Sequence, residues 1–262
     1  MLPGKLWGIE GAAKLCLAII ATFCFGMLLA GLLQNLHTNA PKWLPAAFRA
    51  FMLGLPDAKV EFAQMMISLV FLQGAALVWI TIFLKKNGTG WSEAFGFGQP
   101  ERATALAYGF AAGAIFLPAA LVMQAISEWL MQLLHLTPEL QVAVKELQSP
   151  DITLAEKLIF GFAAIFIAPV AEETIFRGIL YPAVKQKGFP RLALWGTSIV
   201  FALMHGNEAT LLPLLVFALV LVYLYEMFNN LLAPIVAHSL FNTANFLILL
   251  FQDKIDRLLH NT

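Results

Sequence analysis

Long apolar runs dominate the pattern of hydrophobic and polar positions along this chain. Three of these runs carry no charged residue, and they cover residues 15–33, 62–84 and 103–127. Each run is long enough to cross the ~30 Å hydrocarbon core of a bilayer as an α-helix, because a helix rises ~1.5 Å per residue. The apolar positions are continuous and do not alternate with polar ones, so the pattern favours transmembrane helices over the strands of a membrane barrel.

Four further spans are expected in the second half of the chain, at residues 154–184, 192–205, 209–225 and 231–251. They differ from the first three because most of them contain or end in polar residues. The stretch between residues 124 and 157 is amphipathic and predicts a helical extension followed by a surface loop. We therefore predict an all-α, polytopic transmembrane helical bundle of about seven spans with amphipathic connecting helices. It would form a single membrane-embedded domain over residues 1–262.

The composition supports a lipid environment. Apolar residues make up 60% of the chain and charged residues only 12%, whereas soluble domains carry roughly 25% charged residues. Sixteen basic and sixteen acidic residues give a net charge of zero, and no basic stripe indicates a nucleic-acid partner. The two cysteines, Cys16 and Cys24, lie in one apolar run and imply no disulfide framework. Membrane lipid is thus the first expected partner, and the oligomeric state is left open.

The beginning of the chain resembles a signal peptide, because Lys5 and Lys14 precede the first apolar run. That run has 19 residues, which is longer than the roughly 7–15 residues of a signal-peptide core. We interpret it as an uncleaved first span. The basic residues Lys185, Lys187 and Arg191 lie close together between two expected spans, and they favour a cytoplasmic N-terminus by the positive-inside rule.

Three charges lie inside the span expected at residues 154–184, namely Glu172, Glu173 and Arg177. A central charge costs about 2.5–3.5 kcal/mol on insertion scales, so such residues usually face the bundle interior and mark a functional site. Glu173 and Arg177 are four residues apart and can pair on one helix face. Glu172 lies ~100° around the helix and can point elsewhere. The alternative is that all three form one structural ion network.

Two histidines and an amide are expected close to these charges. The spans at 154–184 and 192–205 predict a hairpin that turns near residues 188–190, which would place Glu172 and His205 at similar depth. His238 and Asn242 are four residues apart, so they share a helix face that must meet protein or water. The alternatives are an interfacial histidine for His205, and plain interhelical hydrogen bonding for His238 and Asn242.

The chemistry that these residues permit is hydrolysis by an activated water. The chain has no H-E-x-x-H helix, no G-x-S-x-G elbow and no aspartate inside an expected span. A carboxylate at Glu172 can act as general base, and His and Asn donors can stabilise an oxyanion. Two histidines and one glutamate also make a zinc-ligand set, which would be Glu172, His205 and His238. The residues alone leave both mechanisms open.

Three motifs together resemble the type II CAAX prenyl protease family, also called the Abi or CPBP family. They are E-E-x-x-x-R at residues 172–177, F-x-x-x-H at 201–205 and H-x-x-x-N at 238–242. Each motif is weak alone, but all three occur in the family's order within an apolar chain. The resemblance covers a protease-like core at roughly residues 154–245, while the first three spans, at roughly 15–127, contribute only general architecture.

The resemblance implies an all-α bundle whose catalytic residues line a cavity open to the cytosol and the lipid. It implies that Glu172 activates the water with help from His205, and that His238 and Asn242 form the oxyanion site. Glu173 and Arg177 would hold the site together. A mechanism that needs no metal or other cofactor is favoured, with zinc on Glu172, His205 and His238 as the alternative.

The resemblance also implies an intramembrane endopeptidase that cleaves a membrane-associated peptide or lipidated protein. The substrate would be either a prenylated CAAX-type protein or a bacteriocin-like peptide, and the location a bacterial inner membrane. Two other classes stay open: a non-catalytic immunity or binding protein on the same scaffold, and a proton-coupled transporter with an intramembrane Glu–His relay. The chain shows no pair of broken helices in matching halves, which argues against the transporter.

Overall fold

The structure is a computed structural model that describes residues 7–137 and 142–260. Every regular element in this part of the chain is a helix, which confirms the all-α prediction. Lys5 and residues 138–141 of the amphipathic connection lie outside the described residues. The elements are α1 (Ile9–Asn39), α2 (Ala46–Leu53), α3 (Asp57–Leu69), η1 (Val70–Gly74), α4 (Ala75–Lys86), α5 (Trp91–Phe95), α6 (Arg102–Leu133), α7 (Val142–Gln148), α8 (Leu154–Phe162), η2 (Ala163–Ile167), α9 (Ala168–Glu173), η3 (Thr174–Leu180), α10 (Tyr181–Gln186), α11 (Pro190–Leu203), α12 (Glu208–Phe228) and α13 (Leu232–His260).

Six helical segments among the described residues are long and apolar enough to cross a membrane. They match six of the seven expected spans, and the protein is an integral membrane protein. The segments are Ile9–Asn39, Asp57–Lys86, Arg102–Leu133, Leu154–Gln186, Glu208–Phe228 and Leu232–Gln252.

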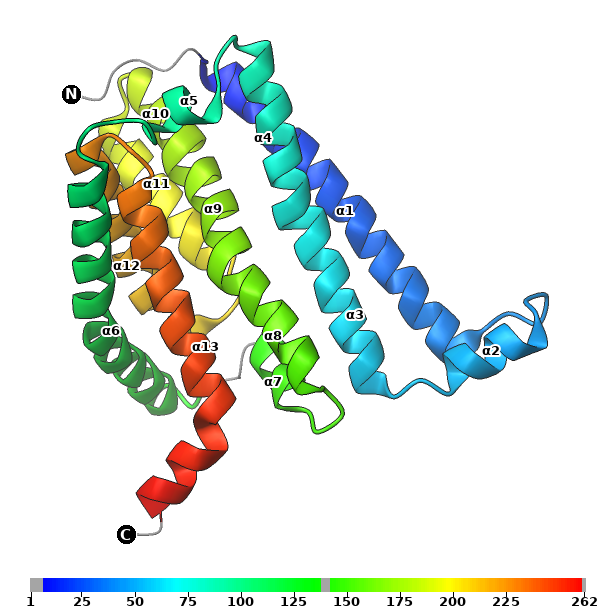
Figure 1. The fold of residues 1–262 in the computed structure, drawn as a ribbon. Coiled ribbons are helices and arrows are strands. Elements are labelled where there is room, and N and C mark those ends of the chain that lie inside the picture. Colours follow the sequence, from blue (N-terminus) through cyan, green and yellow to red (C-terminus); the bar gives the residue numbers. More distant parts are fainter. Residues whose placement is uncertain (1–6, 138–141, 261–262) are drawn as a thin grey trace.

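The expected span at residues 192–205 is shorter than predicted. It forms α11, a helix of 14 residues that ends at Leu203. At ~1.5 Å per residue it is roughly 21 Å long, which is less than the thickness of the hydrocarbon core. The chain nevertheless reverses direction at α11, which packs between α10 and α12. As a result, α1 begins at one end of the molecule and α13 ends at the other (Figure 1).

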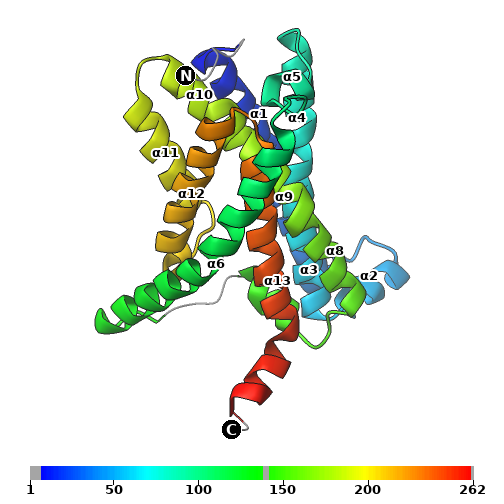
Figure 2. The ribbon, with the colours of Figure 1, turned by 60° about the vertical axis from the view of Figure 1, so that its left-hand side comes forward.

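Small residues hold α6 and α13 together at close range. A Cβ atom on Gly109 would lie 2.4 Å from the carbonyl oxygen of Ala233, and one on Gly113 would lie 3.0 Å from the carbonyl oxygen of Ala237. Such small-xxx-small faces allow helix backbones to approach closely in membranes. Figure 2 shows α6 crossing in front of α13 and then bending away from it. Helix α6 contains an interior proline, Pro118.

Helices α1 and α3–η1–α4 form an antiparallel pair beside the other helices (Figure 1). Near the start of α1 this pair shares an apolar core with α9, η3 and α10, which includes Leu15, Ile80 and Ile179. Farther along, Lys59 of α3 forms an ion pair with Glu156 of α8. The pair is therefore packed onto the helix that carries the expected catalytic residues.

A short loop after α5 fixes the beginning of α13. Gly96 has φ +77°, and a Cβ atom there would lie 2.6 Å from the Cβ of Asn230, so glycine is required on both grounds. The backbone N–H of Leu231 donates to the carbonyl of Phe95 at 3.0 Å. This contact fixes the turn between α12 and α13, seven residues before His238.

Candidate active site

The helix from Leu154 to Gln186 contains two π-helical turns, and the acidic residues lie between them. A capping box between Thr153 and Glu156 begins this helix. Glu172 and Glu173 end α9, and η3 follows immediately with Arg177 inside it. π-Turns are rare in proteins and are frequent at functional sites.

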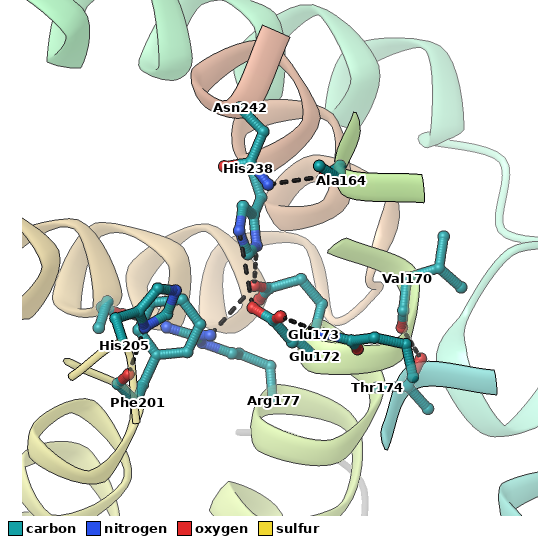
Figure 3. A network of polar contacts seen from close by, with 12 residues as sticks. Ala164, Val170, Glu172, Glu173, Thr174, Arg177, Phe201, His205, His238 and Asn242 are labelled. Atoms are coloured by element: carbon teal, nitrogen blue, oxygen red, sulfur yellow. Dashed lines mark hydrogen bonds and ion pairs between the residues drawn. The ribbon is translucent and has the colours of Figure 1, made fainter. Parts of the chain in front are cut away.

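Glu173 and Arg177 form the buried ion pair that their spacing predicts. Arg177 Nη1 donates to Glu173 Oε1 at 3.1 Å, and the two side chains are 1% and 0% exposed. Arg177 Nη2 donates to the carbonyl of Ala218 on α12 at 3.0 Å. The guanidinium also lies 4.6 Å from the centre of the Phe201 ring. The pair therefore ties α9 and η3 to α11 and α12 in the interior (Figure 3).

His238 of α13 faces both glutamates. Its Nδ1 lies 2.8 Å from Glu173 Oε1, and its Nε2 lies 3.8 Å from Glu172 Oε2. Because a carboxylate only accepts hydrogen bonds, Nδ1 carries the proton in the bond to Glu173. The imidazole is 2% exposed and packs edge-on against the rings of Phe201 and Phe217. Glu173 thus orients the ring so that Nε2 is directed toward Glu172.

Glu172 is the more accessible of the two glutamates, with 19% of its side chain exposed. Its Oε1 accepts a hydrogen bond of 2.8 Å from Nε2 of Gln73, which lies in η1. The sequence prediction did not include Gln73. The sequence does show a glutamine at position 73 within a charge-free run, but polar residues of this kind are common in transmembrane helices and do not by themselves indicate a site.

Asn242 lies one turn after His238 on the same helix. Its Nδ2 donates to the backbone carbonyl of Ala164 at 2.8 Å. Ala164 belongs to the π-helical turn η2, so the amide links α13 to the helix that carries the glutamates. An Asn amide has two N–H donors, and this bond uses one of them.

His205 is not joined to Glu172 by a hydrogen bond or ion pair among the described residues. It follows the end of α11, and its Nδ1 lies 2.8 Å from the carbonyl oxygen of Phe201. Its ring lies 4.9 Å from the Phe201 ring, which in turn contacts His238 at 5.7 Å. The F-x-x-x-H motif therefore contributes the Phe201 ring as a contact shared by Arg177 and both histidines (Figure 3).

The structure also tests how a metal would fit. Among the side chains that the structure describes, no three from His, Cys, Asp or Glu are grouped so that they could hold a metal ion. Glu172 and His238 are close, but His205 is turned toward its own helix. The alternative set of Glu172, His205 and His238 does not fit a zinc ion in this arrangement, and we derive no step through a metal.

Comparisons with known proteins identify the segment that contains all these motifs. Residues 154–244 match the family described as type II CAAX prenyl endopeptidase Rce1-like. The UPF0177 protein YxdF of Lactococcus lactis subsp. lactis (strain IL1403) is 31% identical over 90 residues, which are 34% of this chain. The chain spans 47% of that curated relative. No solved structure matches the chain significantly.

Proposed function

We propose that the protein is an intramembrane endopeptidase, from the premise that residues 154–244 match the Rce1-like type II CAAX prenyl endopeptidase family. It hydrolyses a peptide bond of a membrane-associated substrate with a water molecule activated by Glu172. The observation that carries this proposal is the placement of Glu172, a partly exposed carboxylate beside the otherwise buried pair of Glu173 and His238.

In the proposed reaction, Glu172 accepts a proton from water while the water oxygen attacks the scissile carbonyl carbon. The carbonyl becomes an oxyanion, and its collapse breaks the carbon–nitrogen bond. Glu172 then passes its proton to the leaving amine, as a general acid. We propose that His205 assists this proton transfer after its ring turns from the Phe201 carbonyl toward Glu172. No atom is left unbalanced, because the water supplies the hydroxyl of one product and the proton of the other.

The oxyanion is stabilised by His238 and Asn242. Since Nδ1 of His238 donates to Glu173, Nε2 can donate to an oxyanion when the ring carries both protons. The second N–H of Asn242, which the bond to Ala164 does not use, is the other donor.

The substrate is proposed at the level of its chemistry. It is a prenylated CAAX-type protein or a hydrophobic peptide of the bacteriocin kind, presented from the lipid of a bacterial inner membrane. Both would bring an extended backbone to a site inside the bundle.

The test is cleavage of a farnesylated CAAX-type reporter peptide by purified protein in detergent. Wild type is compared with Glu172→Gln and with Glu208→Gln, an exposed control at the start of α12. We expect Glu172→Gln to lose about 10²–10⁴-fold in rate, the usual contribution of a general base. The Glu208 variant should cleave like wild type.

A zinc chelator is added in parallel. Cleavage that depends on Glu172 and resists the chelator supports the glutamate mechanism, whereas loss of cleavage with the chelator would favour the metal-dependent one. Undiminished cleavage by Glu172→Gln would contradict the proposal. So would a wild-type protein that cleaves neither the farnesylated peptide nor an unlipidated hydrophobic peptide.

A further inference from the structure

We propose that Gln73 is a positioning residue for Glu172, so that the helix pair α1 and α3–η1–α4 forms part of the active site. This inference rests on the proposed function, because it assigns Gln73 a role in the reaction of Glu172. The pair lies outside the 154–244 segment that matches the family.

Gln73 binds one carboxylate oxygen of Glu172 and leaves the other oxygen available to accept a proton from water. Gln73 Nε2 donates to Glu172 Oε1 at 2.8 Å, while Glu172 Oε2 faces His238 Nε2 at 3.8 Å. A Glu side chain has three rotatable bonds, and its terminal torsion is broad. The amide bond to Oε1 removes that freedom, so Oε2 stays directed toward the place where water and substrate meet His238.

Among the polar side chains of the charge-free run 62–84, only Gln73 reaches an ionisable group. Gln64, Ser68 and Thr81 donate to the backbone carbonyls of Ala30, Gln64 and Leu77. Ser68 also lies against Met27 Sδ, and Trp79 donates to the hydroxyl of Thr22, so none of these partners is ionisable. Gln73 itself is 9% exposed. A buried amide needs a partner, and its partner here is the proposed catalytic base.

The backbone around Gln73 departs from a regular α-helix and is packed closely against α1. Gln73 lies in the π-helical turn η1, which packs against α1. A Cβ atom on Gly26 of α1 would lie 2.4 Å from the Cβ of Phe71, so the absence of a side chain at position 26 lets η1 approach α1. Helix α1 therefore supports the turn that presents Gln73 to α9.

The experiment compares three full-length variants in the farnesylated-peptide assay, beside wild type and Glu172→Gln. Gln73→Met keeps the length of the side chain but loses the donor. Gln73→His keeps a ring N–H at a similar reach. Gln64→Met is the matched control, since Gln64 is a glutamine of the same continuous helix whose amide bonds to α1 at 3.0 Å and not to Glu172.

We expect Gln73→Met to lower kcat by about 10–100-fold, as loss of an orienting partner commonly does. KM should change by less than about 2-fold, because the lost interaction acts on the base and not on the substrate. Gln73→His should recover most of kcat. Gln64→Met should leave kcat within about 2-fold of wild type.

The outcomes separate this inference from the proposed function. If wild type cleaves in a Glu172-dependent way but Gln73→Met keeps the wild-type kcat, the positioning role is overturned and the proposed function stands. An equal loss of kcat in Gln64→Met would also overturn it, because helix packing alone would then explain the effect.

A stability measurement tests the contact without relying on activity. The thermal midpoints of Gln73→Met, Glu172→Gln and the double variant are measured in detergent. We expect the double variant to lose clearly less than the sum of the two single losses, as contacting residues do. Gln64→Met combined with Glu172→Gln should be additive. Additive losses for the Gln73 pair would overturn the inference even if no substrate were cleaved.

Discussion

One carboxylate oxygen of Glu173 accepts hydrogen bonds from two side chains, those of Arg177 and His238. Its Oε1 accepts hydrogen bonds from both Arg177 Nη1 and His238 Nδ1, while Oε2 has no hydrogen-bond partner among the described residues. One carboxylate oxygen thus orients the histidine and compensates the buried arginine. A substitution at Glu173 would affect both contacts, whereas one at Arg177 removes the ion pair and the bond to the Ala218 carbonyl but leaves the bond from His238 to Glu173.

Removing Arg177 should destabilise the protein strongly. Arg177→Met leaves the buried Glu173 without its arginine and with the bond from His238 Nδ1, and breaking a buried ion pair typically costs about 3–5 kcal/mol. We expect a lower yield of folded protein and a clearly lower thermal midpoint in detergent.

The matched control is Lys185→Met, which removes a partly exposed pair with Glu226. Pairs near the surface contribute about 0–1 kcal/mol, so this variant should unfold close to wild type. Equal unfolding temperatures for the two variants would show that the Glu173–Arg177 pair has no structural role.

Several site residues were predictable from the sequence and others were not. The pairing of Glu173 with Arg177 follows from their spacing on one helix, and the structure confirms it. Gln73 was not predictable, since its partner is 99 residues away and only the packing of two helices brings them together. The position of His205 depends on where α11 ends, which periodicity does not specify.

At the scale of the elements, each of the three π-helical turns contributes to the polar network. Gln73 lies in η1, the carbonyl of Ala164 in η2 and Arg177 in η3. A π-turn widens the helix locally and changes the direction of its groups. Hydropathy predicts that these segments are helical, but it does not reveal a change of helix type within an apolar run.

Close packing of α6 on α13 is expected to be sensitive to side-chain size. In Gly109→Val the added Cβ would meet the Ala233 carbonyl, a backbone atom that can move only if α13 moves. Overpacking of this kind typically costs about 1–3 kcal/mol. Because α13 carries His238, we expect both a lower thermal midpoint and a lower cleavage rate.

Gly31→Val is the control for this prediction, since nothing lies within 4 Å of the Cβ position at Gly31 of α1. We expect Gly31→Val to leave both the thermal midpoint and the cleavage rate close to those of wild type. If Gly109→Val retained wild-type stability and cleavage, the close approach of α6 to α13 would not position His238.

At the scale of the whole molecule, basic residues gather at the end where α1 begins. They include Lys85 and Lys86 at the end of α4, Arg102 at the start of α6, Lys185 and Lys187 around the end of α10, and Arg191 in the first turn of α11. By the positive-inside rule, we propose that this end faces the cytosol. We propose that the α1–α2 connection then lies on the outer side.

Cysteine labelling tests this orientation in a background without Cys16 and Cys24. Trp43 is 80% exposed in the α1–α2 connection, and Lys187 is exposed at the opposite end. We expect an impermeant maleimide to label Trp43→Cys in intact cells, and Lys187→Cys only after the membrane is permeabilised. The reverse pattern would contradict the proposed orientation.

The sequence predicts about seven spans, and the number of long spans is where the structure differs. Six helical segments among the described residues are long enough to cross a membrane. The seventh expected span is α11, an apolar helix of 14 residues. Composition predicted an apolar helix there. It did not predict that the helix would stop at Leu203, because the turn at Gly206, with φ +60°, is a local backbone choice.

A π-turn contains one residue more than the α-helical turn it replaces. Deleting one residue from Thr174–Leu180 would restore an ordinary helix, which redirects the side chains inside the turn while the residues after it keep their directions. Depending on which residue is lost, Arg177 would leave Glu173, although the length and hydropathy of the span would barely change. A relative that differs here by a single gap would therefore keep its membrane topology and lose its chemistry, so alignment gaps in this turn are informative about activity.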